Sequence, residues 1–447
     1  MNPSTNTANI GSGPASIRHR GPRPPTTYPN KAAIASTPTE PTPDPTAPAS
    51  LSRALVLAAA SRIYYLMLAW SARQLAPDFD ASSDRHSALI KWDALHIESI
   101  AAHGYQHELQ LAFFPLVPAA ARAISSVVGV SVGTAGLVWS NCMFFLAVVA
   151  LYKLTFKVTA SHRSAFSAAV LFSIQPASIF LMSMYTESTF AALSFLGMLA
   201  WEHESNVLAA LFWSLACCTR SNALLHTGYF AYGVVFCSKR RAAWATSALG
   251  VLAVGASYLA VQAYGTHLIC SGIHHDRPFW CPSPTTTTTT SSSVPLFALP
   301  YSHIQAKYWN VGLFRYWTLS NVPNFLIALP ILAHSLVRIW CALVPRIRDG
   351  DHGDSSWLTR LWQALGPLPL NRGERDFGPA YHVQHFVLVL VAMCAMHVQV
   401  AVRMFSSVPG VFVLPSARQK WTRWWVVYSV VWSSVGAVLF GLFYPPA

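Results

Sequence analysis

Long apolar segments alternate with short polar ones along most of the chain. The longer segments can cross about 30 Å of hydrocarbon as helices, and the shorter ones are marginal by length. The long segments are 51–76, 132–157, 164–186, 242–265, 322–342, 381–402 and 424–444, and the shorter ones are 188–202, 206–219 and 223–237. The pattern predicts an all-α polytopic membrane protein with roughly ten transmembrane helices.

Composition supports this class. Of the 447 residues 53% are apolar and 11% are charged, which is too apolar for a soluble globular protein. The net charge of +13 is scattered at the ends of apolar segments, so no nucleic-acid partner is expected. Residues 1–50 are rich in Pro, Ser, Thr and Ala and predict a disordered cytosolic tail. They lack the features of a cleaved signal peptide, so the first span is expected to direct insertion.

Lysine and arginine predict the orientation in the membrane. Three basic turns are expected in the cytosol; they are 152–163, 238–241 and 344–348. Residues 77–131, the turn 185–187 and the loop 266–321 then lie on the opposite, lumenal side. The basic segment 417–423 would also be lumenal by this count, against the rule.

Two interfacial helices are predicted between the first two spans. Residues 152–163 are cytosolic after one earlier crossing only if the segment 111–130 does not span the membrane. Pro115, Pro118 and Arg122 agree with an interfacial or re-entrant helix there. Residues 92–104 before it are amphipathic at helical spacing. Both helices should lie on the lumenal surface.

The chain is expected to have four parts. They are the tail 1–50, a transmembrane module 51–265, a lumenal loop 266–321 and C-terminal transmembrane helices 322–447. The tract 284–293, rich in Thr and Ser, predicts a flexible insertion in the loop. Residues 349–380 predict a cytosolic linker.

Charged residues at membrane depth are costly, so those present are functional candidates. Asp93 and His96 lie three apart on one side of a predicted helix, beside Lys91. A carboxylate here suits a general base, and the alternative is an amphipathic helix with its polar face in water. His103 and His107 have helical spacing, but nothing completes a tetrahedral set, so no metal site is expected.

Further candidates occur in two places along the middle of the chain. Gln175, Tyr185 and Glu187 lie at or near the end of a predicted span. Glu187 suits either function or a water-exposed charge at a helix end. Arg220 lies between two short apolar segments, where it either snorkels to the interface or contacts an anionic ligand.

The segments 304–325 and 397–407 complete the candidates. The first combines amide, cationic and aromatic side chains, which suit sugar stacking and phosphate binding or an aromatic belt at the bilayer surface. Its members are Gln305, Lys307, Tyr308, Trp309, Asn310, Arg315, Tyr316 and Trp317. The second contains His397, Gln399 and Arg403, for which a satisfied polar patch is the alternative. All these candidates fall on or emerge at the lumenal side, which predicts a lumenal active site.

Several blocks together resemble a known family. "KWDALHIESIAAHGYQHELQLAFFPLVP", "QPASIFLMSMYTES", "RSN", "YWNVGLFRYWTLSNVPNF" and "HVQVAVRMFSS" resemble, in order, blocks of the GPI mannosyltransferases that add the second mannose, the PIG-V family. The resemblance runs from about residue 51 to the C-terminus. Ile97, Gln175 and Thr186 depart from the usual family residues, and "RPFWC" is one residue longer than the family version.

The resemblance implies a GT-C glycosyltransferase of the endoplasmic reticulum membrane. The lipid-linked donor would be dolichyl-phosphate-mannose, and the acceptor a GPI precursor mannosylated in α-1,6 linkage, with no metal or cofactor. The implied base is Asp93, and Lys307, Arg315 or Arg403 would neutralise the leaving phosphate in an inverting displacement. Trp92, His96, Glu108, Gln175, Tyr185, Glu187 and Arg220 would bind substrate, together with the candidates of 304–325 and 397–407.

Some alternatives stay open at this point. Cys270 and Cys281 flank a polar loop where an oxidising lumen permits a disulfide, but spacing alone does not establish one. A polytopic lipid or solute transporter is disfavoured, since no inverted repeat is visible and the polar groups collect at lumenal margins. The blocks "YWNVGLFRYW" and "FFPLVP" argue against another dolichyl-phosphate-mannose-dependent mannosyltransferase. The sequence does not decide whether the chain is an inactive scaffold or needs a small membrane partner subunit.

Overall fold

The computed structural model describes most of the chain after its first 46 residues. The described residues are 47–76, 79, 88–237, 241–271, 278, 280–281, 300–348, 357–366, 377–413 and 419–445. All regular secondary structure in them is helical. The predicted tail lies outside them except for its last four residues, and the insertion 284–293 lies outside them altogether.

Five described helices are long and apolar enough to cross a membrane. They are α1 (Ala47–Leu75), α4 (Val132–Thr159), α10 (Arg241–Ser271), α12 (Val322–Arg348) and α16 (Gln419–Gly441). All five match long apolar segments of the sequence. The prediction of an all-helical membrane protein is therefore confirmed, whereas a count of ten spans is not.

The predicted span 164–186 is wrong, because the chain breaks in its middle. Three helices occupy this part of the chain: α5 (His162–Ser173), α6 (Ser178–Met182) and α7 (Glu187–Glu202). Pro176 has no backbone N–H and disfavours a helical preceding residue. Arg62 of α1 donates to the carbonyl oxygens of Ser173 and Ser178, at 3.0 and 3.1 Å. This buried arginine thus donates to carbonyl oxygens on both sides of the break.

The predicted span 381–402 also ends early. Helix α14 (Pro379–Cys394) stops, and the chain continues as short turns that include α15 (Ala401–Met404). Most of residues 401–412 are buried. The carbonyl oxygens of Gly410 and Val411 accept hydrogen bonds from Arg338 and His334 of α12, at 3.1 and 3.0 Å. Side chains thus replace the intrahelical partners of this irregular segment.

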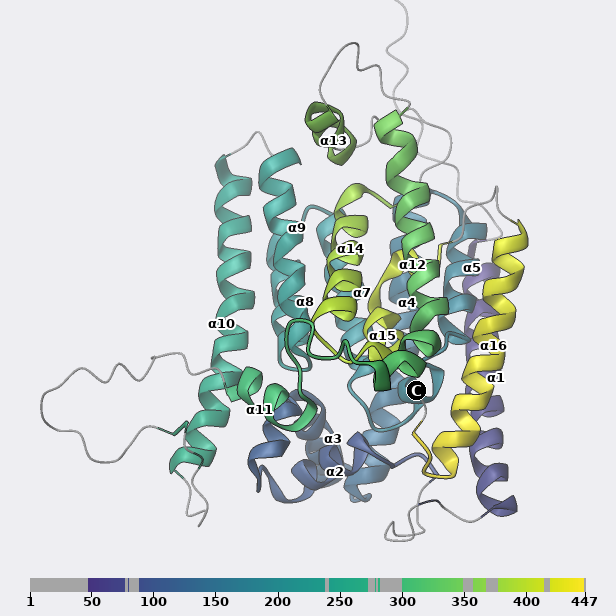
Figure 1. Ribbon diagram of the computed structural model, residues 1–447, viewed down its shortest axis with the longest axis vertical. Coiled ribbons are helices and arrows are strands. Elements are labelled where there is room, and N and C mark those ends of the chain that lie inside the picture. The colour runs from purple at the N-terminus through teal and green to yellow at the C-terminus, as the bar shows by residue number, and fades with distance from the viewer. Residues whose placement is uncertain are drawn as a thin grey trace, which may run out of the picture. The chain divides into compact units, whose positions relative to one another are not determined.

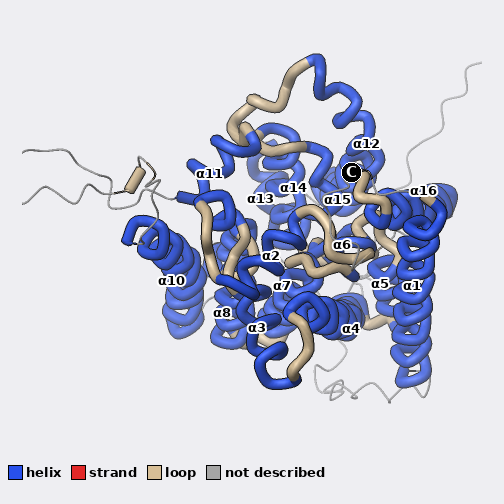
Figure 2. Tube along the Cα trace, turned by 90° about the horizontal axis from the view of Figure 1, so that it is seen from below, coloured by secondary structure: helices blue, strands red, loops and turns tan. Residues whose placement is uncertain are grey.

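Four short helices lie at the two ends of the bundle. Figure 1 shows α2 (Asp93–His103), α3 (Leu116–Val128) and α11 (Pro300–Trp309) gathered at one end, and α13 (Trp357–Leu365) at the other. Figure 2, a view onto the first end, shows α2, α3 and α11 around the ends of the longer helices. Helices α2 and α3 correspond to the two short helices predicted between the first spans. Helix α13 lies within the segment expected to be a linker.

The main core fills the space between the middle helices. It is built largely from apolar side chains of α4, α5, α7, α8 (Asn206–Cys217) and α14. Helix α9 (Thr227–Tyr232) packs between α10 and α14. The fold brings Glu187 at the start of α7 and Arg220 after the end of α8 close to Asp93 at the start of α2.

Helix α16 runs parallel to α1, which bears on the orientation. The hydroxyl of Tyr65 lies 2.6 Å from that of Ser433. Farther along both helices, a Cβ at Gly441 would clash with the backbone of Ala69. The end of α16 therefore lies near α2, and its basic start, residues 419–423, lies at the opposite end, where α4 ends and α10 begins. The basic segment that appeared to break the charge rule thus lies with the other basic turns.

Candidate active site

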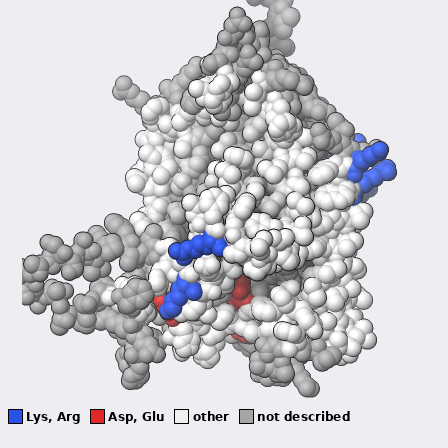
Figure 3. All heavy atoms as spheres, in the orientation of Figure 1, with Lys and Arg blue, Asp and Glu red and all other residues white. Residues whose placement is uncertain are grey.

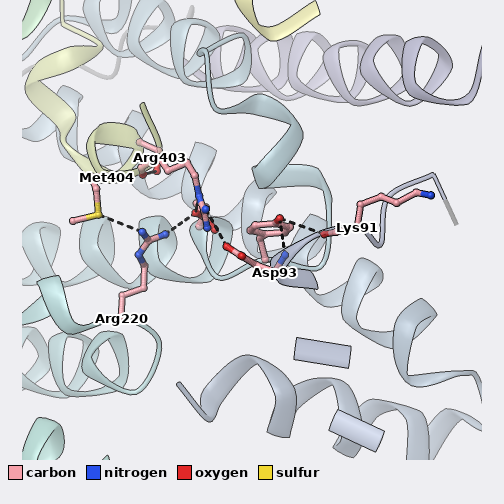
Figure 4. A network of polar contacts seen from close by, with 8 residues as sticks. Lys91, Asp93, Arg220, Arg403 and Met404 are labelled. Carbon is pink, nitrogen blue, oxygen red and sulfur yellow. Dashed lines mark hydrogen bonds and ion pairs between the residues drawn. The ribbon is translucent and has the colours of Figure 1, made fainter. Parts of the chain in front are cut away.

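Four charged side chains form a connected cluster at the first residue of α2, here called the Asp93 cluster (Figure 4). The Asp93 carboxylate lies at a helix N-terminus, where negative charge is favoured. Arg403 Nη1 lies 3.0 Å from Asp93 Oδ2, and Arg403 Nε lies 2.6 Å from Glu187 Oε1. Arg220 Nη1 approaches the same Glu187 oxygen at 2.7 Å. These ion pairs join α2, α7, α15 and the segment that follows α8.

The members of the cluster differ in their access to solvent. The Glu187 side chain is fully buried, whereas that of Asp93 is 33% exposed. Asp93 Oδ1 makes no hydrogen bond to any described residue. Glu187 therefore holds the two arginines in place from inside, and Asp93 presents the carboxylate oxygen that a ligand can reach.

Aromatic rings and a thioether complete the surroundings of the arginines. The Arg403 guanidinium lies 4.7 and 4.9 Å from the ring centroids of Phe180 and Tyr185. Arg220 Nη2 lies 3.3 Å from Met404 Sδ, a weak acceptor. Cation–π contacts and the shared carboxylate thus fix the arginines without using all their N–H groups.

The Tyr185 hydroxyl fixes the start of α2. It accepts a hydrogen bond from the Asp93 backbone N–H at 3.2 Å and donates to the Lys91 carbonyl oxygen at 3.3 Å. Lys91 is buried, with its Nζ 4.8 Å from the centroid of the Phe443 ring. Trp92 has a positive φ of 55° and also stacks against Phe443. The strained turn before α2 is therefore held on both sides by tight packing.

A second cluster surrounds Glu108, between α2 and α3. Its carboxylate accepts hydrogen bonds from Lys307, Tyr308 and Trp280, at 2.5, 3.0 and 2.6 Å. Burial alone would raise the pKa of Glu108, but these hydrogen bonds outweigh it and lower the pKa below its ordinary value. The hydrogen bond to Glu108 raises the pKa of Lys307. The ion pair therefore holds α11 against the turn after α2.

A disulfide stands beside this second cluster. Cys270 and Cys281 are bonded, with their Cα atoms 5.4 Å apart. The bond ties the end of α10 to the turn that carries Trp280, which donates to Glu108. Together the disulfide and Glu108 fix the start and the later part of the loop between α10 and α12.

A third cluster joins the loop after α11 to the segment after α14. Tyr316 donates to Gln399 Oε1 at 2.8 Å and accepts from Asn324 at 2.6 Å. The His397 ring stacks on the Tyr316 ring with centroids 4.4 Å apart and bonds to the Trp309 carbonyl oxygen. Since Gln399 precedes Arg403 by one helical turn, this cluster supports the segment that carries Arg403.

Other predicted site residues make local contacts. The Gln175 side chain is buried and donates to the Phe172 carbonyl oxygen at 3.2 Å, inside the turn before α6. His96 stacks on Phe113. Gln305 lies in α11, and its backbone carbonyl accepts from the Val311 N–H. The last three members lie in the loop after α11: Asn310 and Arg315, which are exposed, and Trp317, which donates to the Met393 carbonyl oxygen.

The pattern of the sequence did not single out four side chains that the structure places in these clusters. They are Phe180, Trp280, Asn324 and Met404. Each lies inside or beside a block that was considered, but its role depends on a partner distant in the sequence or on the path of the chain between them. Among the described residues, no group of three or more His, Cys, Asp or Glu side chains is placed to hold a metal ion.

The space-filling view shows where these clusters reach the surface. In Figure 3 acidic atoms gather in the lower half of the face shown, at the end where α2, α3 and α11 lie, with basic atoms beside them. A further group of basic atoms lies at the upper right, away from the acidic atoms.

Similarity to known proteins identifies the class of enzyme. A family model described as Mannosyltransferase (PIG-V) matches residues 78–346. The GPI alpha-1,6-mannosyltransferase 2 of Rattus norvegicus is 31% identical over 73% of this chain and 72% of its own length. The GPI mannosyltransferase 2 of Cryptococcus neoformans var. neoformans serotype D (strain B-3501A) is 28% identical over 89% of this chain and 99% of its own length.

The chain also resembles solved structures. The oligosaccharyltransferase of Archaeoglobus fulgidus aligns with 87% of this chain and 55% of its own, with a TM-score of 0.45 and 11% identity. The assignment to a family depends on the sequence matches, and the range matched by the family model includes Asp93, Glu187 and Arg220. The chain belongs to the PIG-V mannosyltransferase family and is a glycosyltransferase.

Proposed function

We propose that this protein transfers mannose from dolichyl-phosphate-mannose, in α-1,6 linkage, to the first mannose of the GPI-anchor precursor. The names of its relatives support the acceptor and the linkage: the protein of Yarrowia lipolytica is called GPI mannosyltransferase 2, and that of Mus musculus GPI alpha-1,6-mannosyltransferase 2. The proposed donor is a membrane lipid, as expected for an enzyme with several apolar helices. The proposed fold is that of the GT-C glycosyltransferases, with α2 and α3 as its interfacial helices.

The observation that carries the proposal is the exposed oxygen of Asp93. Oδ2 is held by Arg403 at 3.0 Å, and Oδ1 makes no hydrogen bond to a described residue. An oriented carboxylate suits a general base that takes the proton from the acceptor hydroxyl. Because the donor is β-linked and the product α-linked, one displacement with inversion suffices.

The leaving group needs a cation more than an acid. Dolichyl phosphate departs as an anion, and a fixed guanidinium or ammonium group can stabilise the charge that develops on it. The Asp93 cluster and the loop after α11 supply arginines at the same end of the bundle. We propose that the reaction needs no metal and no cofactor.

The proposed location is the endoplasmic reticulum membrane, with the Asp93 cluster facing the lumen. The basic starts of α10 and α16 and the basic end of α4 lie at the end opposite to α2. Positively charged loops favour the cytosol. The opposite end would then be lumenal, where an oxidising environment permits the disulfide.

The proposal is tested by complementation of cells that lack the second GPI mannosyltransferase. We expect the full chain to restore surface GPI-anchored proteins and to remove the accumulated precursor with one mannose, as scored by lipid analysis. Asp93→Asn should not restore either, whereas Glu98→Gln, on the same helix, should. If the wild-type chain, expressed in the endoplasmic reticulum with any required partner, leaves the precursor unchanged, the proposed acceptor is wrong.

A further inference from the structure

The loop between α11 and α12 is docked on the end of α14. The last carbonyl groups of a helix have no partner within it and need donors from elsewhere. This loop supplies three, of which two are backbone N–H groups. Gly312 N donates to Ala395 at 3.1 Å, Phe314 N to Cys394 at 2.6 Å and Trp317 Nε1 to Met393 at 2.7 Å.

The backbone of the loop is held in an uncommon conformation. Asn310 and Phe314 have φ angles of 50° and 55°, in the left-handed region that bulky residues avoid. Such a conformation persists only when the surroundings determine it. The hydrogen bonds to α14 provide that constraint and hold the backbone of the loop in place.

The tip of the loop is apolar and exposed. Leu313, Phe314, Trp317 and Leu319 have 71%, 54%, 55% and 92% of their surface exposed. They lie at the start of a candidate membrane span, Leu319–Val344. Apolar and Trp side chains at the end of a span meet the boundary between headgroups and acyl chains. The tip therefore lies at the level where the phosphate of a membrane lipid is found.

Arg315 stands within this apolar tip. Its side chain is exposed and forms no ion pair with any described residue. Lys307 and Arg403, the other two cations considered for the leaving phosphate, are already paired with carboxylates. The stem of Arg315 lies over Gly312, where a Cβ would be 2.7 Å from its Cδ and 2.9 Å from its Nε. The glycine thus leaves the room that this arginine occupies.

The loop is continuous with the site. Tyr316, the next residue, donates to Gln399 at 2.8 Å. Gln399 lies one turn before Arg403, which binds Asp93. A lipid phosphate at Arg315 would therefore be held by the element that also supports the arginine beside the proposed base.

We propose that Arg315 binds the phosphate of the polyprenyl-phosphate sugar donor, while the apolar tip contacts the lipid chain beside it. The inference rests on the proposed function, because it assigns the donor's phosphate to one residue of that site. A guanidinium binds a phosphate through two parallel N–H groups and keeps its charge at every physiological pH. An exposed arginine in a lipid-facing loop can reach a phosphate that enters from the membrane.

The test is direct binding of polyprenyl phosphate, without sugar, to the full chain in phosphatidylcholine nanodiscs. We expect Arg315→Gln to weaken binding about 10- to 100-fold, the range for loss of a charge-assisted hydrogen bond. Gly312→Ala keeps the charge but displaces the arginine, and it should weaken binding by a smaller factor. Arg163→Gln, an exposed arginine at the other end of the bundle, is the matched control and should change nothing.

Three results would overturn the inference. The first is unchanged polyprenyl phosphate binding by both loop variants, and the second is an equal loss in the Arg163 control. The third requires phosphatidylinositol binding to be measured in the same nanodiscs: the loop variants would lose phosphatidylinositol binding but keep polyprenyl phosphate binding. The last result would assign Arg315 to bulk phospholipid. Because this assay involves no transfer, a wild-type chain that binds the lipid through Arg315 but transfers no mannose would contradict the proposed function alone.

Discussion

Glu187 should be a positioning residue that holds Arg220 and Arg403 beside Asp93. Glu187→Gln removes the charge that Arg220 and Arg403 share at 2.7 and 2.6 Å, and it leaves two guanidinium groups facing a neutral amide. Removal of one partner of a buried ion pair typically costs about 3–5 kcal/mol. The arginines are 16% and 19% exposed and can be partly hydrated. We therefore expect a loss near the lower limit, on the order of 3 kcal/mol.

The assay is thermal unfolding of the purified chain in detergent, measured beside mannose transfer. Glu98→Gln is the control, because burial raises the pKa of Glu98 and the neutral side chain should cost little there. Arg220→Gln should be less harmful in the Glu187→Gln background than alone, since it then removes an uncompensated charge. This role would be refuted if the Glu187→Gln variant unfolded at the same temperature as the wild type and transferred mannose at the same rate.

The remaining predictions concern the other clusters. Cys270→Ser should lower the free energy of unfolding by about 2–3 kcal/mol, because the unfolded chain is then no longer restricted by a short closed loop. In thermal melts, reductant should destabilise the wild type to the same extent and should not affect the variant. The pKa of Glu108 is lowered from 4.5 and that of Lys307 is raised from 10.5, so their ion pair should stabilise the chain between these values. Stability should fall below pH 4.5 as Glu108 is protonated. In a plot of melting temperature against pH, Glu108→Gln should therefore show a smaller fall at acid pH. Tyr185→Phe leaves the Asp93 N–H and the Lys91 carbonyl without the hydroxyl, which should cost about 1–3 kcal/mol in unfolding experiments.

The membrane helices could be predicted where an apolar segment has no internal break. The segments 132–157 and 322–342 became α4 and α12 almost unchanged, because length and hydropathy decide such helices. The segment 164–186 did not, because Pro176 and the carbonyl groups that Arg62 satisfies matter more locally than mean hydropathy. An arginine inside the first apolar segment was the available signal, and its partners lie more than a hundred residues away.

The candidate residues could be found from the sequence, but their arrangement could not. Charge at membrane depth marks Asp93, Glu187 and Arg403 one by one. Only the folded chain shows that one buried carboxylate is shared between two arginines from different elements. Gln175 illustrates the reverse case: a polar residue in the same block bonds to a neighbouring turn instead of joining the cluster.

Asp93 is the proposed general base, and mannose transfer by the purified protein tests this role most directly. The measurement is the single-turnover rate of mannose transfer from dolichyl-phosphate-mannose to a mannosyl-glucosaminyl-phosphatidylinositol acceptor, with the linkage of the product determined. Asp93→Asn, folded as judged by its melting temperature and still able to bind polyprenyl phosphate, should be slower by about 100-fold or more, the usual contribution of a general base. Transfer by Asp93→Asn at the wild-type rate, with the same linkage, would contradict the assignment of the base.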